Sequence, residues 1–165
     1  MKTKKIYWKN IDQLDSNNQM IKNIHENEFV SKLPVNQNDN IFIGKGVAKV
    51  EWGGQCDDNV GIGSGVMSTG ALNDAHGNVA LGYAAMKTLT QIDNNVAIGS
   101  GCLGSNTTGT SNTSVGTGAL NANTTADSNT AVGYLALVTS TTAARNTAVG
   151  HGALDSVTTG GNNTG

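Results

Sequence analysis

Hydrophobic and polar positions recur with a fixed 17-residue period over most of this chain. The clearest copies begin at Asn112, Asn129 and Asn146 and read Asn-Thr-(Ser or Ala)-Val-Gly-x-x-Ala-Leu. An Asn opens each copy at positions 78, 95, 112, 129, 146 and 163, and an earlier copy that opens at Asn59 carries a two-residue insertion. A fixed period of this kind predicts a stack of identical structural units.

Three further positions are nearly constant when the Asn is numbered 0. Position +3 carries a large aliphatic residue, namely Ile62, Leu81, Ile98, Val115, Val132 and Val149. Position +8 carries Met67, Met86, Leu103, Leu120, Leu137 and Leu154. Position +4 is always glycine, at Gly63, Gly82, Gly99, Gly116, Gly133 and Gly150. Such a glycine implies a positive φ or a backbone approach that leaves no space for a Cβ. We expect two short strands in each rung, with their aliphatic side chains pointing inward.

The remainder of most copies is a polar turn with paired threonines, as in Asn106-Thr-Thr-Gly109; the pair is absent from the Asn59 copy and half kept at Thr90-Gln91. Equal spacing stacks like on like, so amide side chains should form a hydrogen-bonded ladder along the stack. Its members are Asn78, Asn95, Asn112, Asn129 and Asn146. The expected fold is an all-β repeat: a parallel β-roll or β-solenoid of 17-residue rungs over residues 59–165.

Each rung contributes only about two large aliphatic side chains to a core, which is little apolar area against the entropy of ordering a whole rung. A single chain therefore has a thin core. We expect a homotrimer in which three chains pack around a common axis and bury their Gly- and Ala-rich faces.

Residues 1–40 have a different pattern and no repeat. Two capping-box patterns, beginning at Asn10 and Ser16, predict a helical turn near 11–15 and a helix near 17–31. Residues after Pro34 form a linker to Asn40. The large apolar positions of the segment are Tyr7, Trp8, Leu14, Ile21, Ile24 and Phe29. A short helix needs a partner surface, so the segment either folds back on the repeats or, as we favour, docks on another protein.

Residues 41–58 read as a β transition that caps the open end of the repeats, with short strands over 41–43 and 47–52. Trp52 is placed to cover the end of the stack, because repeat arrays need atypical terminal units.

The composition argues against several functional classes. The net charge is -2 and charged residues make up 13% of the chain, which gives no electrostatic case for nucleic acid or an anionic membrane. No apolar run approaches the roughly 20 residues of a membrane span, and no apolar segment follows the basic start. Cys56 and Cys102 are too few for a disulfide framework, and Cys102 reads as a small buried residue. We expect no cofactor and no metal.

The Asn-x-Ala-(Val or Ile)-Gly motif resembles the head repeat of trimeric autotransporter adhesins, a parallel β-roll made by three chains. The longer pattern Asn-Thr-Ala-Val-Gly-Tyr-x-Ala-Leu with Asn-Thr-Thr-Gly is similar to repeats of bacteriophage fibre and tail-spike-like proteins. The resemblance covers residues 59–165. An autotransporter implies a secretion signal and a membrane anchor, and the sequence shows neither pattern. We therefore expect a virion fibre, assembled in the host cytoplasm.

In such a fibre, residues 1–40 would attach to a capsid or tail protein, and the repeats would project outward for adhesion, with a host-surface glycan as a partner. A short basic and aromatic helix suits a peripheral dock, so we favour a head fibre over a tail fibre. The stretch from Tyr7 to Leu14, with Glu28-Phe29, also resembles a segment near the start of bacterial molybdopterin oxidoreductase subunits. From this second resemblance we take only a helical docking segment.

Two other functions stay open from the residues alone. Stacked threonines form a regular hydroxyl array, which suits an ice- or glycan-binding solenoid. Ile98-Gly-Ser-Gly-Cys-Leu103 resembles the hexapeptides of β-helix acyltransferases, with His151 as the candidate base. His151 occupies position +5, however, and the residue at this position varies between rungs. His25 and His76 have no carboxylate or nucleophile near them in the sequence that would suggest a catalytic triad. We therefore expect a protein without enzymatic activity.

Overall fold

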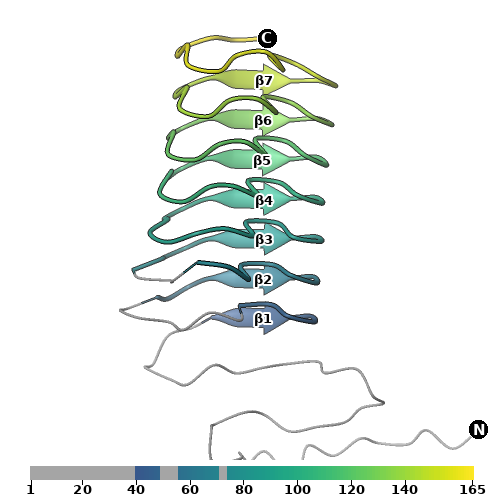
Figure 1. Cartoon of the computed structure of the whole chain (residues 1–165), viewed down its shortest axis with the longest axis vertical. Helices are drawn as coiled ribbons and strands as arrows, with labels where there is room; N and C mark the ends of the chain where they lie inside the picture. Colours follow the sequence, from purple (N-terminus) through teal and green to yellow (C-terminus); the bar gives the residue numbers. More distant parts are fainter. Residues whose placement is uncertain (1–39, 49–55, 71–73) are drawn as a thin grey trace, which may run out of the picture.

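The structure, a computed structural model, describes residues 40–48, 56–70 and 74–165. Within these ranges the chain is an all-parallel β-solenoid with seven strands and no helix. The strands are β1 (Ile41–Ile43), β2 (Val60–Ile62), β3 (Val79–Leu81), β4 (Val96–Ile98), β5 (Thr113–Val115), β6 (Thr130–Val132) and β7 (Thr147–Val149). They pair in chain order in one sheet, so each turn of the solenoid lies on the previous one (Figure 1). The predicted helix near 17–31 and its apolar residues lie outside the described ranges.

The repeat begins one rung earlier than the sequence pattern indicated. Ile41 pairs with Val60 just as Val60 pairs with Val79, and Asn40 takes the place of the rung-opening Asn. The expected strand over 41–43 is confirmed, but it belongs to a rung with the regular register. Val47 and Ala48, which were expected to begin another strand, lie in a turn and are buried. Residues 49–55, including Trp52, lie outside the described ranges.

Each rung from Asn78 onward that the structure describes in full holds one strand of three residues, so the prediction of two strands per rung was wrong there. The residue at position +8 instead lies in a turn with positive φ, for example Met67 at 47° and Leu120 at 49°. A bulky residue in this conformation is uncommon and strained. Every described rung repeats it, from Ala48 to Leu154. The aliphatic period therefore marks the core without marking a second strand.

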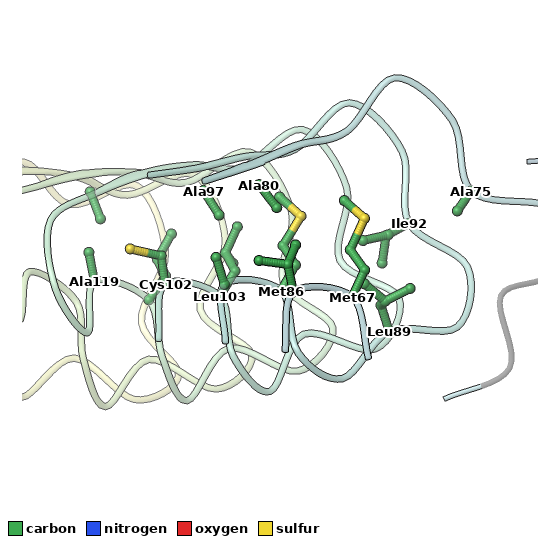
Figure 2. Packing of buried hydrophobic residues seen from close by; sticks show 14 of the residues in the cluster. Met67, Ala75, Ala80, Met86, Leu89, Ile92, Ala97, Cys102, Leu103 and Ala119 are labelled. Atoms are coloured by element: carbon green, nitrogen blue, oxygen red, sulfur yellow. The ribbon is translucent and has the colours of Figure 1, made fainter. Parts of the chain in front are cut away.

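The inward face of the strand was also predicted wrongly. Position +2 points inward and is occupied by Phe42, Gly61, Ala80, Ala97, Ser114, Ala131 and Ala148, all buried. Position +3 points outward, and Ile98 is 39% exposed. Figure 2 shows the reason: Ala80 and Ala97 face Met86 and Leu103 across a narrow coil. The large residue at +8 fills most of that width, so only a small one fits opposite. The Ala-rich face thus lies inside each chain and cannot form the expected trimer interface.

The glycine at position +4 meets both conditions that its constancy implied. Gly116 has φ 127°, a region that residues with a side chain rarely adopt. A Cβ on Gly116 would also lie 2.6 Å from the carbonyl carbon of Gly133 in the next rung. The backbone of successive rungs therefore approaches too closely at this corner for any side chain.

The predicted asparagine ladder is confirmed, and it also closes each rung. The Asn112 side chain is fully buried. Its Nδ2 donates to Asn95 Oδ1 (3.1 Å) and to the carbonyl oxygen of Ala126 (2.8 Å) at the end of its own rung. Its Oδ1 accepts hydrogen bonds from the backbone N–H (3.0 Å) and Nδ2 (3.2 Å) of Asn129. One side chain therefore fixes both the closure of a turn and its register with two neighbours.

Candidate functional site on the outer sheet face

The outward side chains of the seven strands form one continuous surface, which we call the outer sheet face. It consists of positions +1 and +3 of each strand: Ile41, Ile43, Val60, Ile62, Val79, Leu81, Val96, Ile98, Thr113, Val115, Thr130, Val132, Thr147 and Val149. None of these residues is charged. Ile41 is 54% exposed, Ile62 39% and Val149 62%. The face is therefore an uncharged, mainly aliphatic surface whose side chains are half-buried or exposed in a single chain.

Such a surface is unusual for a parallel sheet. Parallel sheets are almost always covered on both faces. Here the inner face packs in the coil, whereas the outer face has no second layer of strands or helices from residues 40–48, 56–70 and 74–165. Large contiguous apolar patches on soluble proteins mark interaction sites. The outer sheet face is therefore the strongest candidate functional site in the described part of the chain.

The composition of the outer sheet face changes along the solenoid. Position +1 is aliphatic in the first four strands, at Ile41, Val60, Val79 and Val96. It is threonine in the last three, at Thr113, Thr130 and Thr147. Position +3 stays aliphatic throughout. The face thus has an aliphatic part over β1–β4 and a mixed part over β5–β7.

The paired threonines of the polar turns do not present a complete hydroxyl array. The first threonine of three pairs, at Thr107, Thr124 and Thr141, is half-buried, and its hydroxyl donates to a backbone carbonyl of the next rung. Thr107 Oγ1, for example, lies 2.9 Å from the carbonyl oxygen of Thr124. The second threonine is exposed, as at Thr108 and Thr125. Only one of the two predicted hydroxyl columns is therefore open to a ligand.

Position +5 forms an exposed corner, as its variability suggested. Tyr83 is 67% exposed and Tyr134 is 51% exposed. The rings of Tyr134 and His151 stack with their centroids 5.2 Å apart and an interplanar angle of 21°. His151 therefore packs on an aromatic neighbour at the solenoid surface.

The sequence did not predict the contact between His76 and Asp57. The imidazole Nδ1 of His76 contacts Asp57 Oδ1 of the preceding rung, although the sequence showed no carboxylate arranged with this histidine. The two residues are separated by 19 positions, the length of that longer rung, so stacking places one above the other. The hydrogen bond to Asp57 raises the pKa of His76, and the charges of Asp57, Asp93 and Asp74 add to the effect. Counting rung length at each position would have found this pair.

The predicted attachment residues lie outside the described ranges; they are Tyr7, Trp8, Leu14, Ile21, Ile24 and Phe29. The predicted repeat residues within the described ranges have structural roles. The ladder asparagines and the +4 glycines hold neighbouring rungs together, as described above. Cys102 is buried as expected, its thiol donates to the carbonyl oxygen of Gly116 (2.7 Å), and burial raises its pKa. Burial also raises the pKa of the Cys56 thiol. No cluster of three metal-ligating side chains occurs among the residues that the structure describes.

Comparisons of the chain with protein-family models, with curated proteins and with solved structures found no match. Within the described ranges, no helix has the length and apolar character needed to cross a membrane.

Proposed function

We propose that this chain is a structural fibre protein of a virion. Three copies associate through their outer sheet faces into a shaft, and residues 1–40 attach the shaft to a capsid or tail protein. The outward part serves adhesion to the host surface. The protein acts by binding and display, without catalysis or a cofactor.

The observation that carries this proposal is the exposed, uncharged outer sheet face of a regular solenoid. An occupant of this face must match seven strands that rise with the strand spacing of a parallel sheet, about 4.8 Å per rung. A further copy of the same solenoid matches that spacing over the whole length. Self-association therefore covers the apolar face, completes the thin core of each chain and leaves the polar turns outside.

Attachment through residues 1–40 is supported by the contrast between the two parts of the chain. Interfaces favour aromatic anchors, and Tyr7 and Trp8 lie in this segment. The turns of the solenoid present mainly Thr, Asn and Ser, which suit a soluble shaft. In a trimer, three copies of the segment meet the particle together, so modest contacts combine through effective concentration.

Two measurements test the proposal. Sedimentation of the full chain should give about three times 16.9 kDa, and a monomer at all concentrations would contradict the trimeric shaft. Deletion of residues 1–40 should leave the trimer intact but prevent its co-purification with particles of the virus that carries the gene. Normal decoration by the truncated chain would place attachment elsewhere.

A glycan- or ice-binding solenoid is the second candidate, favoured by the exposed threonine column at Thr108 and Thr125 and by the exposed Tyr83. Replacing the exposed threonine of each pair with Val should abolish glycan or ice binding in that case. It should leave assembly and particle attachment unchanged if the fibre proposal is correct.

A further inference from the structure

We infer that the outer sheet face is a seam between parallel, in-register copies of this chain, dry along β1–β4 and hydrated along β5–β7. This inference rests on the trimeric shaft proposed above and specifies how its copies meet. It follows from the change at position +1 from Ile or Val in β1–β4 to Thr in β5–β7. This change becomes visible only when the rungs are compared with one another along the sheet.

The orientation of the copies follows from the two parts of the face. If copies lie parallel and in register, Val60, Val79 and Val96 meet their own counterparts in an aliphatic layer. In the same arrangement Thr113 and Thr130 meet threonines. An antiparallel arrangement would instead place the valines against the threonines, which buries hydroxyl groups among aliphatic side chains at a free-energy cost. The parallel arrangement avoids this mismatch and brings all the N-terminal segments to one end.

Hydration of the second part follows from the hydrogen bonding of its threonines. The hydroxyls of Thr113, Thr130 and Thr147 form no hydrogen bond within residues 40–48, 56–70 and 74–165. A buried hydroxyl without a partner is unfavourable, whereas a bridging water satisfies it at little entropic cost. Water should therefore accompany these three layers into the seam, and the valine layers should exclude it. The association is then held mainly by β1–β4.

Matched substitutions test this distribution in the full chain. Val and Thr have nearly the same shape, and Thr already occupies position +1 of β5–β7, so a Val→Thr change leaves the fold of one chain intact. The first variant carries Val60→Thr, Val79→Thr and Val96→Thr in the dry part. The matched control carries Val115→Thr, Val132→Thr and Val149→Thr in the hydrated part. Circular dichroism checks that both variants keep the strand content of the unmodified chain.

Sedimentation equilibrium gives the deciding comparison. We expect the first variant to dissociate at a concentration at least about tenfold higher than the control variant, because its new hydroxyls enter a dry layer. Equal dissociation of both variants would overturn the division into dry and hydrated parts. A trimer that neither variant weakens would place the interface off this face and overturn this inference, but it would leave standing a trimeric fibre attached through residues 1–40. A wild-type chain that never associates would contradict both.

Disulfide trapping tests the orientation independently. Single changes Val79→Cys and Thr130→Cys each place identical thiols opposite one another only if copies are parallel and in register. We expect both variants to form covalent dimers on oxidation. Thr125→Cys, on the exposed threonine column, should stay monomeric under denaturing conditions and serves as control. Native Cys56 and Cys102 are buried and do not compete. Failure of both seam variants to cross-link would overturn the parallel register.

Discussion

His76 joins three consecutive rungs, because its imidazole contacts Asp57 in the rung before it and its backbone N–H donates to Asp93 Oδ1 (2.9 Å) in the rung after it. Asp74 lies in the same environment, so three carboxylates influence one histidine. The imidazolium form balances part of this negative charge. The junction between the first rungs should therefore be sensitive to pH.

We predict that the stability of these rungs falls as pH rises through the pKa of His76. The folded-state pKa is raised above its ordinary value of 6.5, so the stabilising contribution is complete below 6.5 and is lost above the raised value. Thermal unfolding of the wild type and of His76→Gln should therefore converge at alkaline pH and differ most at mildly acidic pH. The same measurement on His151→Gln separates the effect of this junction from the loss of an imidazole at another place in the solenoid. A constant difference between wild type and His76→Gln at every pH would contradict the prediction.

Gly116→Val should damage the solenoid far more than Thr117→Val. Val at 116 combines a disfavoured positive φ with a clash against the backbone of Gly133, whereas Thr117 is exposed at the variable corner. The glycine change should exceed the ~1 kcal/mol scale of ordinary strand substitutions, and Thr117→Val should remain within about 0.5 kcal/mol of wild type. Urea unfolding followed by circular dichroism measures both. Equal midpoints would show that the glycine corner tolerates a side chain.

Asn112→Ala should be among the most destabilising substitutions in the solenoid. It leaves the backbone N–H and the Nδ2 of Asn129 without their partner, whereas the carbonyl oxygen of Ala126 keeps a hydrogen bond from Asn123 Nδ2. Each unsatisfied buried group costs about 1–3 kcal/mol, so the total should be roughly 2–6 kcal/mol. Chemical denaturation gives the value, with exposed Thr108→Ala as the control of small effect. A loss below about 1 kcal/mol would mean that water replaces the amide in the ladder.

Ser140→Asn should stabilise the solenoid. Asn123 Nδ2 donates to Asn106 Oδ1 (3.1 Å), but Asn123 Oδ1 is buried without a hydrogen-bond partner in the described part of the chain, since the next residue in the column is Ser140. An asparagine at 140 can donate to that oxygen and extend the hydrogen-bonded column of Asn106 and Asn123 by one rung. We expect a gain of about 1 kcal/mol in the free energy of unfolding. Ser140→Ala is the control and should produce no gain.

The sequence predicted the features that depend on the spacing of the repeat. It did not predict which strand residues point inward, because that depends on the width of the coil. The period alone predicted the parallel stack, the Asn112–Asn129 contact and the close approach at Gly116. Whether Ala131 or Val132 points inward depends on how much space Leu137 leaves inside the coil, and one aliphatic residue per strand cannot decide that. For this reason the spacing predicts a core position for residues such as Val132, whereas the structure places them on the outer sheet face.

The rung beginning at Asn40 was missed for a different reason. Its strand carries Phe42 where later rungs carry Gly, Ala or Ser, and the interval from Asn40 to Asn59 is longer than the regular period. Both departures hide the repeat from a search at one fixed period. Asp57 and His76 are separated by the same longer interval. The strand pairing of Ile41 with Val60 and the hydrogen bond between Asn40 and Asn59 identify this rung in the structure.

The register between neighbouring rungs also makes the length of this protein modular. Each described rung contacts only the rungs next to it in the sheet, as in other quasi-one-dimensional repeat arrays. Excision of the segment 112–128 would join Ser111 to Asn129 and preserve every position of the pattern. The protein would become shorter by one strand spacing, about 4.8 Å, with its remaining surfaces unchanged. Duplication of the same unit in a gene would lengthen it by the same step, so natural variants of this architecture should differ in reach by whole rungs.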